Sequence, residues 1–270
     1  MLRLPKIVNI ELTNFCNANC KMCTYSIMKR RKGFMSSNVF KTVIDKLAEL
    51  DSIEHIQLHG HGESFLHKDI NEFANYAKSK CPNKIISLFT NGVLVEKIPD
   101  GFDHIVISFN GGNKKTYEKM MGLNFENAVE KIRSVTPKNK VTLQMLLCKS
   151  NVDSKEDFEK LWYGWKFGMH DGYYNWAGNL PYDGVHPPPL SGICSRLFIH
   201  MSIHWNGIVN LCTQDYEQTT FVGSIITNSI IDIYNSPLFV RKRKEQKAGI
   251  WSDICKDCSY CKWEHLENDD

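Results

Sequence analysis

The stretch Cys16-Asn17-Ala18-Asn19-Cys20-Lys21-Met22-Cys23 places three cysteines within eight residues. It follows a strand-like run, Ile7-Val8-Asn9-Ile10-Glu11-Leu12-Thr13, so we expect the cysteines just beyond the end of the first strand. Three thiolates on one short loop can bind a single metal centre. Four would complete a tetrahedral zinc site or a cubane iron–sulfur cluster. Three leave one iron of a [4Fe–4S] cluster open to a substrate or cofactor.

Two simpler interpretations of these cysteines are a zinc knuckle and isolated residues of the core. A zinc knuckle needs a nearby fourth ligand, either a cysteine at Cys-x2-Cys spacing or a histidine. The first histidine after the loop is His55, and no cysteine lies in between. The spacing therefore favours an open iron–sulfur cluster over zinc.

The composition is that of an ordinary globular protein. The chain has 270 residues, 42% of them hydrophobic and 23% charged, which is enough for one large domain and a small one. A net charge of +3 is too mild to indicate a nucleic-acid partner. The densest basic run is Lys29-Arg30-Arg31-Lys32. A solvated loop is its simplest interpretation, and contact with an anionic substrate or a redox partner is the alternative.

The use of cysteine indicates the compartment. The chain contains ten cysteines but no secretory signal, and no apolar run is long enough to span a membrane. Cysteines without an export signal indicate metal ligation in a reducing compartment rather than a disulfide scaffold. We therefore expect a cytoplasmic protein that does not contact membranes.

Strand-like and helix-like runs alternate through the first two thirds of the chain. This alternation predicts a parallel sheet with right-handed crossovers. Six strand–helix units fall short of the eight in a closed barrel, so the sequence predicts an α/β fold built as a partial (β/α)6 barrel. The predicted strands cover residues 7–13, 55–59, 84–89, 104–109, 141–147 and 173–176, and the predicted helices cover residues 39–50, 68–80, 124–135 and 155–167.

Polar and glycine-rich residues follow the second, third and fourth predicted strands. They are Gly60-His61-Gly62-Glu63, then Thr90-Asn91-Gly92, then Ser108 and Asn110. Parallel α/β folds build their sites at the carboxyl ends of the strands, so we expect these residues near the cysteine loop. Glycine suits positions where the backbone must approach a ligand closely.

The cysteine loop and these strand ends, in this order, resemble the radical S-adenosylmethionine (SAM) enzymes. The resemblance implies a [4Fe–4S] cluster held by Cys16, Cys20 and Cys23, with SAM chelated at the open iron through its amino and carboxylate groups. It implies cleavage of SAM to methionine and a 5′-deoxyadenosyl radical. That radical abstracts a hydrogen atom from an unactivated C–H bond, and the protein supplies orientation and excludes side reactions.

The same resemblance implies which side chains meet SAM. Gly62 and Glu63 correspond to the family's motif beside the methionyl amine, although Ser64 stands where a proline is usual. Ser108 and Asn110 correspond to a pair that contacts the ribose and carboxylate, and Asn110 lacks the charge of the usual aspartate. The implied SAM-binding residues are Met22, Gly62, Glu63, Asn91, Ser108 and Asn110.

The composition changes at Pro181. Residues 181–189 end in three consecutive prolines, which exclude a helix or a central strand, and they are predicted to form a linker. Beyond it, strand-like runs at 197–204 and 208–211 flank Trp205-Asn206-Gly207, a strong hairpin signal. A helix is predicted over residues 237–247.

The cysteines beyond this linker resemble the SPASM domain, or its shortened twitch form, that many radical SAM enzymes carry. The resemblance implies an auxiliary [4Fe–4S] cluster, with Cys255 and Cys258 as the expected terminal ligands and Cys261 as a substitute or spare. A structural zinc site would fit the same cysteines and stays open as an alternative. We expect a core over residues 1–185 and a SPASM/twitch-like domain over residues 186–270. The implied auxiliary ligands are Cys194, Cys212, Cys255, Cys258 and Cys261.

The small size and single auxiliary site resemble family members that oxidise or epimerise a carbon of a small hydroxylated substrate. That substrate would be a sugar or resemble an aminocyclitol. The auxiliary cluster would accept an electron from the substrate radical in oxidation, and a cysteine thiol would quench the radical in epimerisation. Cys148, at the end of the fifth predicted strand, is the candidate hydrogen donor. A small buried hydrophobic residue is the alternative reading of Cys148.

Two other functions remain open from the sequence alone. One is radical SAM chemistry on a short peptide, although the chain begins directly with the core and offers no leader-binding domain ahead of it. The other is a zinc-binding interaction module. For the enzyme, the resemblance implies flavodoxin or ferredoxin as the electron donor, and we expect no nucleic-acid partner.

Overall fold

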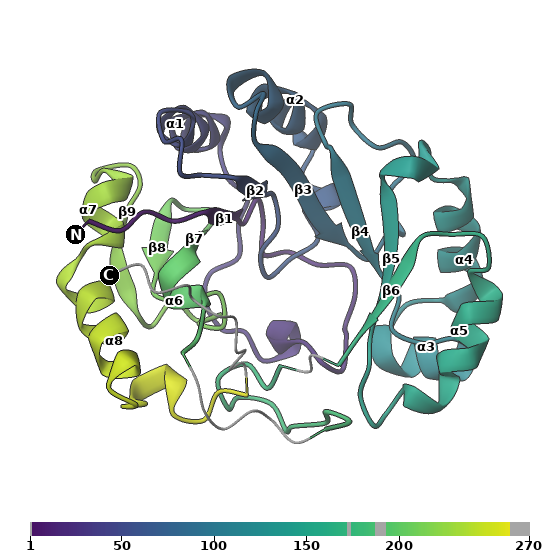
Figure 1. The fold of residues 1–270 in the computed structure, drawn as a ribbon. Coiled ribbons are helices and arrows are strands. Elements are labelled where there is room, and N and C mark those ends of the chain that lie inside the picture. Colours follow the sequence, from purple (N-terminus) through teal and green to yellow (C-terminus); the bar gives the residue numbers. More distant parts are fainter. Residues whose placement is uncertain (1, 172–173, 187–192, 260–270) are drawn as a thin grey trace.

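A curved sheet with helices on its outer side makes up the fold in the computed structural model, which describes residues 2–171, 174–186 and 193–259 (Figure 1). Within these residues nine strands form one continuous sheet in the order β6-β5-β4-β3-β2-β1-β7-β8-β9. The strands are β1 Ile7–Ile10, β2 His55–Gln57, β3 Ile85–Thr90, β4 His104–Ser108, β5 Val141–Leu146, β6 Phe167–His170, β7 His200–Ile203, β8 Ile208–Asn210 and β9 Phe221–Ser224.

The first six strands are parallel to their neighbours, as the alternation of strands and helices predicts. The sheet stays open between β6 and β9, which confirms a partial barrel. The C-terminal hairpin extends the same sheet: β7 pairs in parallel with β1, and β8 and β9 continue antiparallel from it. β1 therefore lies inside the sheet, between β2 and β7.

Helices cover the outer face of the sheet, and the hollow of the barrel is on the other side (Figure 1). The helices of the fold are α1 Ser37–Ala48, α2 Ile70–Lys80, α3 Lys114–Met121, α4 Phe125–Ser134, α5 Lys155–Leu161, α6 Arg196–Ile199, α7 Ile230–Tyr234 and α8 Pro237–Lys247. Short 3-10 turns lie at Thr24–Ser26, Ser64–Leu66, Lys138–Lys140, Val152–Ser154 and Asp253–Cys255.

The two-residue period of the strands sorts apolar and polar side chains onto opposite faces. Val8 and Ile10 of β1 are fully buried in the core beneath the helices. Asn9, between them, belongs to the other face and lies opposite Gln57 of β2 and Ser202 of β7 in the strand register. The inner face of this barrel is therefore polar, which prepares it to surround a polar ligand.

Capping residues account for the predicted helices that the structure confirms. The Ser36 side chain accepts a hydrogen bond from Val39 N at the start of α1, and the Asn124 side chain accepts one from Asn127 N at the start of α4. Such caps satisfy backbone N–H groups that the first helical turn leaves free. α2 and α8 also occupy their predicted ranges.

The sixth strand was predicted at residues 173–176, and that prediction is wrong. The strand is β6, Phe167–His170, and the helix expected over 155–167 ends at Leu161. Gly164, at φ +81°, turns the chain back towards the sheet. Trp176 and Ala177 have φ values of +49° and +56°, which are incompatible with a strand. Tyr174 and Trp176 have the aromatic composition of a strand, but the chain turns at Trp176; residue 173 lies outside the described residues.

Two further differences concern helices. α3 was not expected, because its sequence, Lys-Lys-Thr-Tyr-Glu-Lys-Met-Met, contains few apolar positions. The strand expected over 197–204 begins only at His200, because Leu197 and Phe198 lie in α6 and are buried there. The Asn-Gly hairpin is confirmed, with Gly207 at φ +79°. The Pro187–Pro189 part of the expected linker lies outside the described residues.

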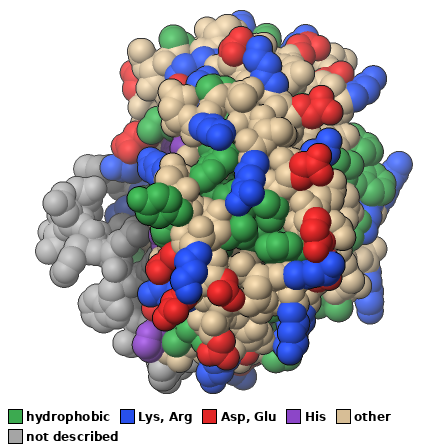
Figure 2. Space-filling view, turned by 90° about the vertical axis from the view of Figure 1, so that its right-hand side faces the viewer, with side chains coloured by type: hydrophobic (Ala, Val, Ile, Leu, Met, Phe, Trp, Pro, Cys, Tyr) green, Lys and Arg blue, Asp and Glu red, His purple; other side chains and the backbone are tan. Residues whose placement is uncertain are grey.

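The outer surface over α4 and α5 carries Lys, Arg, Asp and Glu side chains interspersed with one another around a few hydrophobic ones (Figure 2). Interspersed charges of both signs are typical of a solvated face. Among the described residues, no helix has both the length and the apolar character needed to cross a bilayer.

Candidate functional site

A cavity of about 610 Å³ opens on the inner side of the sheet, at the carboxyl ends of its parallel strands. This volume lies within the roughly 300–1,000 Å³ that is usual for small-molecule sites. The cavity is lined by Cys16, Cys20 and Cys23 and by all six residues that the sequence assigned to SAM binding, Met22, Gly62, Glu63, Asn91, Ser108 and Asn110. The fold therefore brings these residues together around one space.

The cysteine loop is fastened to α3. Asn19 N and Lys21 N donate hydrogen bonds to the carbonyl oxygens of Met121 and Met120, at 3.3 and 2.9 Å. Both acceptors belong to the last turn of α3, whose carbonyl groups have no partner within the helix. α3, which was not predicted from the sequence, therefore supports the cysteine loop.

The three thiols fit a metal cluster. Burial, and repulsion from Glu63 and Cys23, raise the pKa of the Cys16 thiol to about 11. Burial, and the neighbouring Cys23 and Cys16, also raise the pKa of Cys20. Three thiolates so close together are unfavourable unless a cation compensates their charge. An iron–sulfur cluster is such a partner, and Cys16, Cys20 and Cys23 would hold it.

Gly62 and Glu63 lock the cysteine loop against the end of β2. A Cβ atom on Gly62 would lie 2.4 Å from Thr13 O and 2.5 Å from Phe15 O, so only glycine fits there. The next residue, Glu63, donates its backbone N–H to Phe15 O at 2.8 Å. This motif therefore sets the position of the residue directly before Cys16.

The Glu63 carboxylate is committed to the protein. It accepts hydrogen bonds from Asn91 N at 2.8 Å, Thr90 Oγ1 at 2.9 Å and Phe65 N at 3.1 Å. Asn91 in turn donates from Nδ2 to Asn17 Oδ1 of the cysteine loop at 2.8 Å. These hydrogen bonds thus connect three segments, namely the turn after β2, the turn after β3 and the cysteine loop. Because the carboxylate is already occupied, we expect Glu63 to contact SAM through its backbone, as the resemblance implies.

Asn110 has a structural partner as well as a place in the cavity. Its Oδ1 accepts from Leu146 N at 2.8 Å, which joins the ends of β4 and β5. Met22 is 9% exposed, and its carbonyl oxygen accepts from Trp176 Nε1 at 2.8 Å. The turn that replaces the expected sixth strand therefore places an indole against the cysteine loop.

Cys148 lies apart from these residues. Its side chain is fully buried with Met22 and Met120 and is not among the side chains that line the cavity. Burial, and a hydrogen bond to Asp183, raise the pKa of this thiol to about 11. The structure thus places Cys148 behind Met22 rather than at the cavity surface.

Four of the auxiliary cysteines converge on a second, smaller cavity: Cys194, Cys212, Cys255 and Cys258 all line it. Burial, and repulsion from Cys212 and Cys258, raise the pKa of Cys255 to about 12. Four converging thiols fit a fully ligated cluster, and these residues would hold it. Cys261 lies outside the described residues.

The two cavities share a wall made by Arg196 and Gln214, which line both of them. Arg196 Nη1 donates to Thr213 Oγ1. Gln214 N donates to Cys212 Sγ at 3.4 Å, and hydrogen bonds to cysteine sulfur are one way in which proteins tune cluster potentials. The auxiliary cysteines therefore lie directly behind one side of the main cavity.

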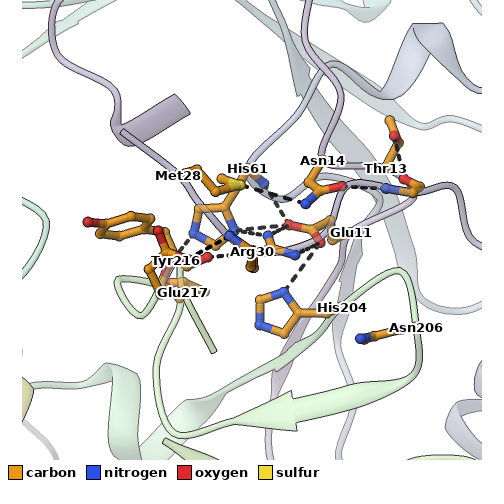
Figure 3. Close-up of polar contacts among 12 residues, drawn as sticks. Glu11, Thr13, Asn14, Met28, Arg30, His61, His204, Asn206, Tyr216 and Glu217 are labelled. Carbon is orange, nitrogen blue, oxygen red and sulfur yellow. Dashed lines mark hydrogen bonds and ion pairs between the residues drawn. The ribbon is translucent and has the colours of Figure 1, made fainter. Parts of the chain in front are cut away.

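A buried ion pair between Glu11 and Arg30, together with the histidines that contact it, joins the two halves of the chain (Figure 3). Arg30 Nη1 and Nη2 donate to Glu11 Oε1 and Oε2, at 3.0 and 2.6 Å, and both side chains are at most 6% exposed. His61 Nδ1 and His204 Nδ1 lie 3.0 and 3.3 Å from the same carboxylate. We name these four residues the Glu11 clamp.

The Glu11 clamp reaches further into the C-terminal region. Arg30 Nε donates to Tyr216 O, and His61 Nε2 lies 2.9 Å from Thr213 O. Burial opposes ionisation of Glu11, but the charges and hydrogen bonds of His204 and His61 hold its pKa well below the ordinary value. The ligand atoms of Glu11, His61 and His204 lie within 4.8 Å of one another, close enough for a metal ion. Arg30 already binds both carboxylate oxygens, so the guanidinium supplies the compensating charge.

Comparison with known proteins agrees with this geometry. Residues 10–161 match the Radical SAM superfamily, and residues 194–259 match the SPASM iron–sulfur cluster-binding domain. The S-adenosyl-L-methionine-dependent 2-deoxy-scyllo-inosamine dehydrogenase of Niallia circulans is 25% identical over 272 residues, covering 96% of this chain and 94% of that protein.

Two solved structures are similar in fold. BtrN in complex with AdoMet and 2-DOIA has a TM-score of 0.67 at 22% identity, covering 96% of this chain and 94% of BtrN. Streptococcus suis SuiB bound to the precursor peptide SuiA has a TM-score of 0.71 at 12% identity, covering 97% of this chain and 72% of SuiB.

The fold and the site define an iron–sulfur enzyme that uses SAM. The superfamily match covers more than half of the chain, and the chain belongs to the radical SAM superfamily, with a SPASM domain at its C-terminal side. Its cofactors are SAM and [4Fe–4S] clusters.

We predict that Arg30→Met lowers the free energy of unfolding by about 3–5 kcal/mol, because it leaves the buried Glu11 carboxylate without its cation. The loss should be largest at neutral pH, where Glu11 is ionised in both states. It should shrink as the pH falls below the ordinary glutamate pKa of 4.5, because the stabilisation from a lowered pKa disappears on acidification. Anaerobic urea unfolding measures both effects.

The matched control is Lys114→Met, which removes the exposed Lys114–Glu126 pair, 58% and 59% exposed. It should change the free energy of unfolding by less than about 1 kcal/mol. Equal losses for the two variants would contradict the structural role of the Glu11 clamp.

Proposed function

We propose that this enzyme abstracts a hydrogen atom from a carbon of a small hydroxylated substrate, a sugar or an aminocyclitol, and oxidises or epimerises that carbon. The observation that carries the proposal is the polar inner face of the cavity. The relative from Niallia circulans, which matches almost the whole length of this chain, acts on 2-deoxy-scyllo-inosamine by name and supports the same substrate class.

Four buried polar atoms around the cavity need a partner. Within the described residues, Asn9 Oδ1, His59 Nδ1, His200 Nδ1 and Gln214 Oε1 have no hydrogen-bond partner, and all four side chains line the cavity. Each such atom costs about 1–3 kcal/mol when it stays unpaired. A ligand with several hydroxyl groups, which both donate and accept, could satisfy donors and acceptors together.

Two histidines of this inner face, His59 and His200, are neutral at physiological pH. Burial, and the positive charge of Arg196, lower the pKa of His59 to about 3 and that of His200 to about 4. Asn9 Nδ2 lies 3.2 Å from His59 Nε2 and 2.8 Å from Gln57 Oε1, so the amide orients both groups. Neutral donors and acceptors suit hydroxyl groups.

The cofactors would supply the radical chemistry, and the residues of the two cavities would hold the cofactors and the substrate in place. When bound, the cysteine-loop cluster and SAM supply a 5′-deoxyadenosyl radical, which takes a hydrogen atom from the substrate carbon. Turning an alcohol carbon into a carbonyl also removes the hydroxyl proton and one electron. Cys194, Cys212, Cys255 and Cys258 would hold the oxidised cluster that takes this electron. Arg196 and Gln214, in the shared wall, would hold the reacting oxygen on the side of that cluster.

The remaining expectations complete the proposal. An external flavodoxin or ferredoxin reduces the loop cluster, and the protein works in the cytoplasm. We also propose a core over residues 1–185 and an auxiliary domain over residues 186–270. Met22, Gly62, Glu63, Asn91, Ser108 and Asn110 are proposed to contact SAM. A short peptide is the competing substrate, and the likeness to peptide-bound SuiB supports only the shared fold.

Iron content tests the two cysteine sets. We expect about eight irons per chain after anaerobic reconstitution and about four in the triple variant Cys16→Ala, Cys20→Ala, Cys23→Ala, because each set would hold one cubane. Cys81→Ala is the control: Cys81 is buried outside both sites, so about eight irons should remain. About four irons in the wild type, falling to none in the triple variant, would rule out an auxiliary iron–sulfur cluster.

Gln214→Leu tests the polar face. Because Gln214 Oε1 has no partner among the described residues, we expect an unchanged or higher Tm but at least a roughly tenfold weaker Kd for 2-deoxy-scyllo-inosamine, from the loss of one ligand hydrogen bond. Anaerobic calorimetry measures both quantities.

The matched control is Gln246→Leu in the auxiliary cavity. Gln246 Oε1 accepts from Cys194 N at 3.1 Å, so this variant should lose about 1–3 kcal/mol of stability while keeping the Kd. Equal losses of Tm in the two glutamine variants would assign Gln214 a structural role instead.

Cys148→Ala separates the two outcomes of the reaction. In dehydrogenation no thiol is needed, so we expect the variant to keep both SAM cleavage and carbonyl formation. If Cys148 donated the hydrogen atom in an epimerisation, the variant would keep SAM cleavage but fail to return a hydrogen atom, and deuterium from the solvent would no longer enter the product. Because Cys148 does not line the cavity, we expect the deuterium content of the product to stay unchanged. Product analysis by mass spectrometry in deuterated buffer distinguishes the two.

A further inference from the structure

The segment that contains the cysteine loop has a one-sided charge. Between Glu11 and Asp45 the sequence has no acidic residue. The same interval has six basic ones, Lys21, Lys29, Arg30, Arg31, Lys32 and Lys41. A segment that carries six positive charges and no negative one differs from the mixed-charge face over α4 and α5 in Figure 2.

Backbone contacts bring the basic run beside the cysteine loop. Thr13 forms an isolated antiparallel bridge with Phe34. Asn14 Nδ2 donates to Arg31 O at 3.0 Å, and Thr13 Oγ1 donates to Gly33 O at 2.8 Å. Residues 31–34 therefore run alongside residues 13–14, which lead directly into Cys16.

Exposed apolar side chains lie on the same two segments. Phe15 and Phe34 stack with ring centroids 5.0 Å apart and are 36% and 46% exposed. Ile27 is 40% exposed, and Lys32 Nζ lies 3.7 Å from the centroid of the Tyr25 ring. Aromatic and apolar groups surrounded by charged ones are typical of protein interfaces.

The cations of this surface are not neutralised. Arg30 is used inside the Glu11 clamp, but in the described part of the chain no acidic side chain pairs with Lys29, Arg31 or Lys32. The Glu217 carboxylate accepts hydrogen bonds from the backbone N–H groups of Lys29 and Arg30, at 2.7 and 2.8 Å, and not from their side chains. Lys29 and Arg31 are exposed, and Lys32 is half-buried.

We propose that Phe15, Ile27, Lys29, Arg31, Lys32 and Phe34 form a docking surface for an acidic one-electron carrier protein. We name it the basic aromatic surface. The inference rests on the proposed use of an external electron donor. One electron leaves the reduced carrier and enters the cluster on the cysteine loop, and no bond is made or broken. Phe15 directly precedes Cys16, so a partner seated here lies next to the cluster.

The charge of the surface selects the partner. Interfaces for electron transfer are small, and complementary charge mainly speeds the encounter and orients the two proteins. An uncompensated basic rim around a small apolar centre provides both functions for an acidic protein. A basic partner would be repelled by the positive charges. A long neutral peptide would gain no electrostatic attraction from the lysines and arginines.

The experiment compares two reductants in the same enzyme. SAM cleavage to 5′-deoxyadenosine is measured anaerobically, driven either by an excess of dithionite or by increasing concentrations of reduced flavodoxin. The variants are Arg31→Glu/Lys32→Glu and Phe34→Ser. Lys155→Glu/Lys160→Glu, at two exposed positions of α5, is the charge-matched control. The readout needs no substrate, so it is independent of which molecule the cavity binds.

We expect the double charge reversal to raise the flavodoxin concentration for half-maximal rate at least tenfold and Phe34→Ser to raise it several-fold. The dithionite-driven rate should stay within twofold of wild type in both. The wild-type rate with flavodoxin should fall with added salt, and the double variant should lose this dependence.

Three outcomes would overturn the docking surface. The first is a flavodoxin response equal to wild type in the variants. The second is an equal loss with dithionite, which would mean a damaged cluster. The third is a wild-type enzyme that flavodoxin cannot reduce while dithionite can. If the surface instead receives a substrate peptide or a membrane, the variants keep their response to flavodoxin.

Discussion

The charge of Glu11 has to be neutralised inside the protein, and this requirement holds the structure together. Glu11 follows β1, Arg30 comes from the segment after the cysteine loop, His61 follows β2 and His204 follows β7. A buried carboxylate is stable only with a well-placed cation and further hydrogen bonds. The contacts of Arg30, His61 and His204 with Glu11 therefore position four separate parts of the chain relative to one another.

The position of the clamp explains how the two cysteine sets come to line neighbouring cavities. His61 lies between Gly60 and Gly62, and the second of these glycines fixes the residue before Cys16. On the other side, His61 contacts Thr213, next to Cys212 and Gln214. The clamp thus connects the loop for the first cluster to the wall of the second. In most proteins a buried ion pair adds little net stability, and its value here is specificity of arrangement.

Much of this site could be predicted from the sequence because its signals are local. The spacing of Cys16, Cys20 and Cys23 and the glycine-containing strand ends lie within short segments, and the two-residue period of a strand determines which side chains face the cavity. The sixth strand was misplaced because aromatic residues near Trp176 have strand-like composition, whereas positive φ angles there form a turn. α3 was missed because it is only eight residues long and its apolar set, Tyr117, Met120 and Met121, spans little more than one turn.

The clamp and the shared wall could not be predicted, because their members are far apart in sequence. Glu11 and His204 are 193 residues apart. In the sequence, Arg30 is one member of a basic run, and His61 is one residue of a glycine-rich turn after the second predicted strand. Only the folded arrangement reveals that Arg30 is buried while its neighbours Lys29 and Arg31 remain exposed. The members of one basic run are thus divided between the interior and the surface.

The place of β1 between β2 and β7 has a consequence for synthesis on the ribosome. β1 is made first, but one of its two neighbours, β7, is made only after some two hundred residues. Until then one edge of β1 exposes unpaired backbone groups, and such edges invite pairing with other chains. The growing chain therefore carries an incomplete sheet edge for most of its translation. Closure of that edge by β7 is expected to be a late step of folding, and it brings Cys194 and Cys212, which flank the strand pair β7–β8, to the second cavity.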